Sequence, residues 1–395
     1  MSNSAASVEL PSSLSSLQKV GIALAVLAGG ATVAGAFVAP DHFYKAYLVG
    51  YLFWIGIAAG SFAVVMLHHL TAGAWGFSVQ RIMESGSRTL PLMALLFIPL
   101  LFGLDELYMW ARPEVVAGDR ILQSKEPYLN VPFFVVRAAI YFGVWVLMAA
   151  LLNRWSRRQD DSNGNTSFTH RMVVLSGPGI VLFVLTMTFA AFDWVMSLEP
   201  HWFSTIFGLL LIVGQGLSTF AFGIVILAML ASHKPLSDYA DADKFHDLGK
   251  LLLGFTMLWG YIMLSQYLII WSGNIPEEVT WYLHRSSHGW GALSAALVLL
   301  HFFVPFFVLL TRHTKRRPQV LATIAIFILA MRLLDIFWLV VPSEHHPELS
   351  FHWLYVATVL GVGGLWLTVF VWQLKTRPLL PMGDPRFEEA MHGSH

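Results

Sequence analysis

Residues 191–204 read AFDWVMSLEPHWFS and close a run of about 25 apolar residues that begins near Met172. Asp193 lies inside the apolar part of the run, and Trp194, His201 and Trp202 follow in an exit that also holds a Glu and a Pro. A helix needs about 20 apolar residues to cross the hydrocarbon core of a bilayer. The stretch therefore predicts a membrane-spanning helix that carries a carboxyl group close to one face of the membrane.

Three other apolar runs end in a similar way. They read LDELYMWARPE at 104–114, SQYLIIWSGNIPEE at 265–278 and LDIFWLVVPSE at 334–344. The second residue of each stretch is a polar residue that we expect to be buried: Asp105, Gln266 and Asp335. Aromatic residues follow it, and then a Pro and a Glu. The four endings predict one polar layer near one face of a membrane, built several times along the chain.

The composition indicates a chain that is mostly embedded in a membrane. Hydrophobic residues make up 56% of the 395 residues, charged residues 12%, and the mean hydropathy is +0.63, whereas soluble domains average about 25% charged residues. Lys and Arg together number 24, as do Asp and Glu, so the charge balance predicts no nucleic-acid partner. The absence of Cys excludes Cys-ligated iron–sulfur clusters, covalently attached c-type haem and disulfides within this chain.

Ten apolar runs predict an all-α integral membrane protein with about ten transmembrane helices. The runs lie near 20–39, 43–70, 90–110, 132–152, 172–196, 203–230, 248–271, 289–310, 320–341 and 351–374. They lack the alternation of barrel strands, so helices are the expected way to satisfy the backbone in lipid. We expect a disordered tail over 1–18, a ten-helix domain over 19–374 and a second tail over 375–395.

The distribution of Lys and Arg predicts the orientation, because cytoplasmic loops carry an excess of both. They gather after 132–152, 203–230 and 289–310 and in the C-terminal tail, as Arg154, Arg157, Arg158, Arg171, Lys234, Lys244, Arg312, Lys315, Arg316, Arg317, Lys375, Arg377 and Arg386. The connections after 172–196 and 320–341 contain neither residue. Both termini should therefore be cytoplasmic, with the polar layer toward the outer face.

Charged side chains inside spanning helices are costly and usually face the interior of the bundle or a water-filled path. Arg332 and Asp335 are three residues apart and so share one helix face. They either form a structural ion pair or belong to such a water-filled path. Arg137 either neutralises Asp105, Glu106 or Asp193, or extends to the interface. Asp193 has no cationic neighbour in sequence, so we interpret it as a proton relay.

Two further groups of polar residues lie on or near predicted helices. His246, Asp247 and Lys250 open the helix near 248–271; they either favour the helix N-terminus or form the inner mouth of a proton path that Gln266 and Tyr267 continue. His288 and His301 are thirteen residues apart, but no second helix offers a matching pair, so we expect no bis-His haem. Nucleotide, nucleophile and zinc-protease motifs are absent, so the chain should not carry out bond-breaking chemistry alone.

Three segments give the chain a family resemblance. FDWVMSLEPHWFST (192–205), HDLGKLLLGFTMLWGYIMLSQYLIIWSGNIPEE (246–278) and RSSHGWG (285–291) resemble the ActF-type membrane subunits of alternative complex III, which are similar to the NrfD and polysulfide-reductase membrane-subunit family. The resemblance covers essentially all ten spans. It implies two four-helix bundles, from the second to fifth helices (about 43–196) and the sixth to ninth (about 203–341), flanked by the first and tenth, in a bacterial cytoplasmic membrane.

The resemblance also implies a function. Such complexes, respiratory or photosynthetic, oxidise quinol, often menaquinol, and pass the electrons through iron–sulfur and c-type cytochrome subunits to a periplasmic acceptor. This chain would bind no cofactor covalently and no metal, and would lie beside an ActC-like paralogue, which is the better-supported quinol site in such complexes. It would support quinol oxidation, with quinone binding or proton translocation as its own expected contribution. The predicted proton-relay residues are Asp105, Glu106, Arg137, Asp193, Arg332, Asp335, His246, Asp247, Lys250, Gln266 and Tyr267, and the quinone-side residues are His201, His288 and Trp194.

Two other functions fit the same residues. A secondary transporter would also have repeated bundles with polar groups near the midplane, and would bind a solute between the bundles without partner subunits. A structural scaffold would use the polar layer for helix packing and the aromatic exits for docking other subunits. The sequence alone does not separate these functions from quinol oxidation.

Overall fold

The computed structural model describes residues 12–162, 165–342 and 349–387, and throughout this part the regular elements are helices. Nine described segments are long and apolar enough to cross a membrane. They are α1 (Ser12–Val38), α2 (Pro40–Thr71), α8 (Val131–Asp160), α9 (Thr166–Trp194), α10 (Phe207–Leu230), α11 (Ala242–Gly273), α16 (Pro318–Val340), α17 (Trp353–Leu374) and one composite helix. The composite helix consists of α13 (Trp290–Ala296), the π-helical η4 (Leu297–Phe303) and α14 (Val304–Leu310). The chain is an all-α integral membrane protein.

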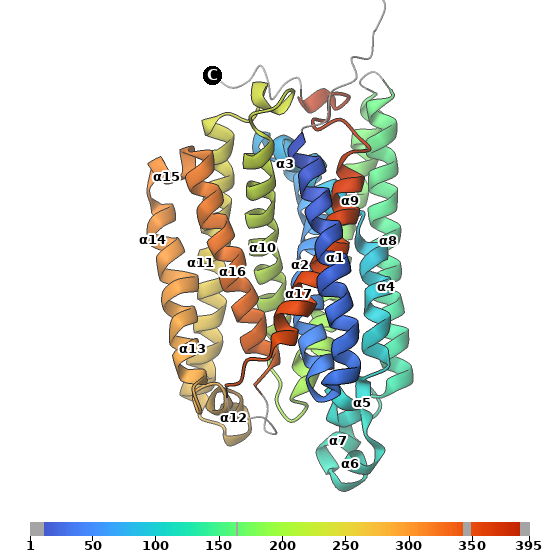
Figure 1. Cartoon of the computed structure of the whole chain (residues 1–395), viewed down its shortest axis with the longest axis vertical. Coiled ribbons are helices and arrows are strands. Elements are labelled where there is room, and N and C mark those ends of the chain that lie inside the picture. The colour runs from blue at the N-terminus through green and yellow to red at the C-terminus, as the bar shows by residue number, and fades with distance from the viewer. Residues whose placement is uncertain (1–11, 163–164, 343–348, 388–395) are drawn as a thin grey trace, which may run out of the picture.

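The third predicted span is shorter than expected. Instead of running over 90–110, α4 (Leu90–Leu101) ends at a turn, and α5 (Leu104–Leu107) and η1 (Met109–Ala111) follow. A helix of 12 residues is about 18 Å long, less than the hydrocarbon core of about 30 Å. A short turn joins α4 to α3 (Ala74–Ser87), which precedes it. The end of α2 and the start of α8 lie at opposite ends of the molecule (Figure 1). The chain therefore crosses between them along α4, which adds one pass to the nine segments named above.

The N-terminal helix starts earlier than the sequence suggested. We expected a disordered tail over 1–18, but α1 begins at Ser12, and residues 1–11 lie outside the described part. Leu14 is fully buried, and the ammonium group of Lys375 donates hydrogen bonds to Ser15 (3.2 Å) and Gln18 (2.8 Å). These long-range contacts order the first turns of α1, and sequence composition does not report them.

The described part of the C-terminal tail packs against the bundle. Arg377 donates to the carboxylate of Glu84 (3.0 Å) and to the backbone oxygen of Asn153 (2.7 Å). Phe387 is buried against the rings of Phe77 and Tyr239. Residues 375–387 therefore form a strap over one end of the molecule, while 388–395 lie outside the described residues.

The spanning helices pack in two groups that meet at the centre. In one group α2 packs on α4 and α9, and α8 packs on α4 and α9; in the other, α10 packs on α11 and α16, while α11 packs on α14. The two groups meet where α10 contacts α2 and α9. A Cβ on Gly60 of α2 would collide with Thr219 of α10, so this close approach needs the glycine. The pair α1 and α17 lies against α2 (Figure 1).

The two ends of the bundle differ in character. The start of α1, the end of α8 and the short α15 (Arg312–Arg316) lie at one end, which we call the basic end (Figure 1). The strap of residues 375–387 packs at the same end, because Lys375 contacts the first turns of α1. The other end carries α5, α6 (Pro113–Gly118), α7 (Arg120–Lys125) and α12 (Pro276–His284), and we call it the aromatic end (Figure 1). Both described chain ends thus lie on the same side as the basic loops; their cytoplasmic location stays a prediction.

The contact between α1 and α17 generates a prediction. A Cβ on Gly364 would collide with the backbone nitrogen of Ala25, so Gly364→Leu should separate the two helices and lower the free energy of unfolding by about 1–3 kcal/mol. Thermal unfolding of the purified chain in mild detergent measures this. Gly30→Leu is the matched control, because a Cβ there meets nothing within 4 Å. Equal melting temperatures for the two variants would contradict the packing.

Candidate functional site

The predicted polar layer is only partly buried. Asp193, Gln266 and Asp335 are buried, but Asp105 and Glu106 are exposed on α5. The expectation that Asp105 lies inside an apolar span was wrong, because α4 ends before this residue. The backbone oxygens of Asp105 and Glu106 instead accept hydrogen bonds from Arg112 at the surface.

Asp193 has a cationic partner that the sequence did not specify. Arg137 of α8 makes two parallel hydrogen bonds to the Asp193 carboxylate, from Nε (2.8 Å) and Nη2 (2.9 Å), and the Tyr141 hydroxyl donates a third (2.9 Å). The guanidinium of Arg137 also stacks 3.9 Å from the centre of the Tyr128 ring. Of the three acids that Arg137 was predicted to neutralise, the structure pairs it with Asp193, and the pair joins α8 to α9.

Arg332 and Asp335 form the predicted ion pair within α16, and both are buried. Trp259 of α11 donates to the same carboxylate oxygen at 3.1 Å. The Trp259 ring packs edge-on against His301, 4.1 Å between ring centres, and His301 lies in the π-helical segment η4. Neither ring nitrogen of His301 has a hydrogen-bond partner among the described residues. This polar cluster ties three helices of the second group together.

The residues proposed for an inner proton path do not form one cluster. Asp247 accepts a hydrogen bond from Lys250 (2.9 Å) in a largely exposed pair at the start of α11, beside the half-buried His246. Gln266 lies 16 residues beyond Lys250 along α11, about 24 Å away at 1.5 Å per residue. It contacts Ser204 at 3.2 Å. The two sets therefore lie toward opposite ends of the same helix.

The three quinone-side candidates are also separated. Trp194 is buried in an aromatic cluster with Phe97 and Phe142 in the first group of helices. His201 is exposed at the aromatic end, with its Nε2 2.5 Å from an Asp119 oxygen. His288 is exposed in a left-handed turn with φ of 48°. The structure does not bring these three residues to one site.

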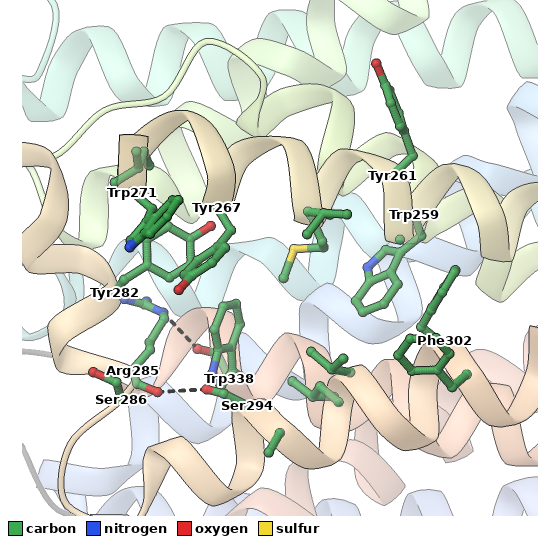
Figure 2. Close-up of a pocket in the computed structure, with 18 of the residues that line it drawn as sticks. Trp259, Tyr261, Tyr267, Trp271, Tyr282, Arg285, Ser286, Ser294, Phe302 and Trp338 are labelled. Carbon is green, nitrogen blue, oxygen red and sulfur yellow. Dashed lines mark hydrogen bonds between the residues drawn. The ribbon is translucent and has the colours of Figure 1, made fainter. Parts of the chain in front are cut away.

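A cavity of about 780 Å³ lies between α11 and the composite helix, and we call it the lateral cavity (Figure 2). Its walls are mainly apolar and aromatic, with Trp259, Tyr267 and Phe302 among the lining side chains. Tyr261 and Trp271 border it and are each 67% exposed, as expected for side chains that face lipid. Of the predicted relay residues, Tyr267 lines this cavity.

Polar groups gather at the end of the lateral cavity near α12. Arg285 is buried, with its guanidinium stacked 3.8 Å from the Trp281 ring centre and its Nε donating to the backbone oxygen of Trp338 (3.2 Å; Figure 2). The Ser294 hydroxyl donates to the Arg285 backbone oxygen at 2.7 Å and accepts from the Trp338 indole at 2.8 Å. The Tyr282 hydroxyl accepts from Gln266 (3.3 Å), and burial raises the pKa of Tyr282 to about 12.

A second cavity, of about 590 Å³, lies at the aromatic end and is more polar. Glu199, His201 and His284 are among its lining residues. Glu199 accepts hydrogen bonds from Arg285 (2.8 Å) and from His284 (3.2 Å). Burial by itself would raise the pKa of Glu199, but the charge of Arg285 and these hydrogen bonds outweigh it, so the pKa lies below its ordinary value. The Arg285–Glu199 ion pair thus connects the lateral cavity to the second cavity.

Sequence reasoning missed Arg285, Glu199, His284 and Tyr282 as site residues. The signals were present, because Glu199 lies within the first quoted stretch and Arg285 opens the motif RSSHGWG. We searched for charges inside apolar runs, and these four residues lie between runs. From that motif we chose His288, which the structure places at the surface.

The buried pair of Arg137 and Asp193 generates a prediction. Asp193→Leu leaves a buried guanidinium without its carboxylate, which should lower the free energy of unfolding by about 3–5 kcal/mol. The double variant Arg137→Met/Asp193→Leu should lose less, because no charge is left unpaired. Denaturation in detergent compares both with Asp247→Leu, which breaks an exposed pair and should cost about 0–1 kcal/mol. A single variant as stable as this control would contradict the argument.

No protein-family model matches this chain, and no curated protein matches it. The resemblance of 192–205, 246–278 and 285–291 to subunits of alternative complex III therefore stays a prediction, and the functional argument rests on the geometry of the two cavities.

Proposed function

We propose that this chain is a membrane subunit of a quinol-oxidising electron-transfer complex of the alternative complex III type, and that its lateral cavity receives the quinol. One observation carries the proposal: the buried Arg285–Glu199 pair joins a lipid-facing aromatic cavity to a polar cavity at one end of the molecule. A membrane-soluble reductant that releases protons on one side of a bilayer needs both features. Menaquinol is the expected substrate.

The size and lining of the lateral cavity support a quinol. Small-molecule sites usually enclose about 300–1,000 Å³ with mainly apolar walls and a few polar groups, and this cavity has about 780 Å³. The rings of Trp259, Tyr267 and Phe302 offer faces and edges on which a flat aromatic head group can pack. The exposed border at Tyr261 and Trp271 would let the isoprenoid tail stay in the lipid.

The polar end supplies groups suited to proton release. Oxidation of one quinol yields one quinone, two protons and two electrons. In the proposed pose the quinol hydroxyl groups point toward Tyr282 and Arg285, and protons pass to Glu199 and His284, which border the second cavity. Arg285 lowers the pKa of Glu199 and keeps its carboxylate ionised, so a proton taken up there would be released readily toward the second cavity. The electrons pass to redox cofactors of partner subunits, the expected iron–sulfur and c-type cytochrome subunits, at the aromatic end.

Membership of such a complex is tested first by purification through a tag on this chain in mild detergent. We expect iron–sulfur and c-type cytochrome subunits to co-purify, and a reduced-minus-oxidised visible spectrum to show c-type haem. Subunit mass spectrometry identifies the partners. A lone, colourless chain would contradict the proposal and favour the secondary transporter.

Filling the lateral cavity tests the role of this chain in quinol oxidation. Ala295 lines the cavity, so Ala295→Trp should displace the head group and slow oxidation of a menaquinol analogue about tenfold or more, since small misplacements have large kinetic effects. Ala292→Trp is the matched control, because Ala292 is exposed one turn away and is not among the lining residues. Both variants should assemble with the partners. Unchanged quinol oxidation in an assembled Ala295→Trp complex would favour a scaffold.

A further inference from the structure

The basic end carries a group of basic side chains that neither cavity includes. The first turns of α11 and the short helix α15 pack against each other there, and both are rich in basic residues, four of which concern us here. We call them the interfacial basic cluster: His246, Lys250, Arg312 and Lys315. Lys315 contacts Gly249, the neighbour of Lys250 in α11, so the packing of α15 on α11 brings basic residues of both helices to the start of α11.

Lys315 is held in an unusual position for a lysine. The residue is only 7% exposed, and its aliphatic stem lies across Gly249 of α11, where a Cβ would come within 2.7 Å of the Lys315 Cγ. Within the described residues, Lys315 has neither an acidic partner nor a hydrogen bond from its ammonium group. Burial, and then the charge of Lys250, lower the pKa of Lys315. A lysine whose stem is held by packing and whose ammonium group has no carboxylate partner can bind an anion from outside the chain.

The acids around the cluster are already paired. Asp247 accepts from Lys250 at 2.9 Å, and Asp243 pairs with Arg316 at the edge of the cluster. Arg312 is exposed and, like Lys315, has no acidic partner among the described residues. Two cations of the cluster, Arg312 and Lys315, therefore have no carboxylate partner among the described residues.

An apolar stripe leads away from the cluster along α11. Lys250, Gly254, Met257, Tyr261 and Leu264 follow at intervals of three or four residues, so they share one face of the helix. All five are exposed, and the last three border the lateral cavity. A charged head at Lys250 and a hydrocarbon chain along this face would thus both meet matching groups.

We propose that the interfacial basic cluster binds the phosphate of an anionic phospholipid, whose acyl chains lie along the exposed stripe of α11. Basic pockets between spanning helices are suited to such head groups. The apolar stripe favours a lipid over free phosphate, because inorganic phosphate would gain nothing from it. The head-group site lies apart from the lateral cavity, whereas the acyl chains would lie beside it, along residues that also line that cavity.

The test uses the full chain, with any subunits that co-purify, after delipidation in detergent. Phosphatidylglycerol should raise the melting temperature and stay bound in native mass spectrometry, whereas phosphatidylcholine should do neither. Arg312→Gln/Lys315→Gln should weaken retention of phosphatidylglycerol about tenfold or more, since each cation contributes to attraction. The charge-matched control Arg157→Gln/Arg158→Gln, at exposed positions of α8, should behave like the wild type.

Three outcomes would overturn the proposal. An equal shift with inorganic phosphate would indicate an anion site without lipid, and an equal shift with phosphatidylcholine would indicate a general apolar effect. Equal loss of lipid in the control would indicate attraction to surface charge at large. Should the double variant fail to fold, Arg312→Gln alone, at an exposed position, must still weaken retention, and Lys315→Arg must preserve it.

Discussion

A charged side chain inside the hydrocarbon region must find its partner within the protein, because lipid offers none. This constraint connects the helices of the present chain. Arg137 and Asp193 join α8 to α9, the Arg332–Asp335 pair accepts a tryptophan N–H from α11, and Glu199 after α9 reaches Arg285 after α12. Removing one member of a buried pair leaves the other charge buried without a partner, so these contacts determine which helices are neighbours. The apolar residues around them add most of the buried area without choosing the partners.

The sequence predicted the fold well where apolar runs are long and uninterrupted. The run at 320–341 became α16 at Pro318–Val340, and the run at 43–70 became α2 at Pro40–Thr71. The sequence-based prediction failed where contacts between distant parts of the chain determine where a helix begins or ends. The run at 90–110 looks continuous in hydropathy, but a turn after Leu101 ends α4. The composition of residues 12–18 is that of a disordered tail. Hydrogen bonds from Lys375, which is 357 positions from Gln18, order these residues instead.

The candidate site was harder to predict than the fold. Looking for charges in apolar runs found Arg137, Asp193, Arg332 and Asp335, but could not say that the first two are partners across 56 positions. The same search passed over Arg285 and Glu199, which lie between runs and are 86 positions apart. A cavity is a property of how helices pack, and the alternation of apolar residues carries no signal for it. From the motif around Arg285 the sequence analysis selected His288, which the structure places at the surface.

The positions of the polar groups along the bundle bear on energy coupling. Glu199 and His284 border a cavity at the aromatic end, whereas Lys250 and Asp247 pair at the basic end. About 24 Å of α11 separates Lys250 from Gln266, at 1.5 Å per residue. Under the proposed function, quinol oxidised at the lateral cavity would release its protons at the aromatic end, and such release would require no continuous proton path through the protein. The buried pairs at Asp193 and Asp335 are then free to serve packing, since each carboxylate is held by a guanidinium in its own group of helices. The two cavities meet at an ion pair: Arg285 lines the lateral cavity, Glu199 lines the second, and the charge of Arg285 keeps the pKa of Glu199 below its ordinary value.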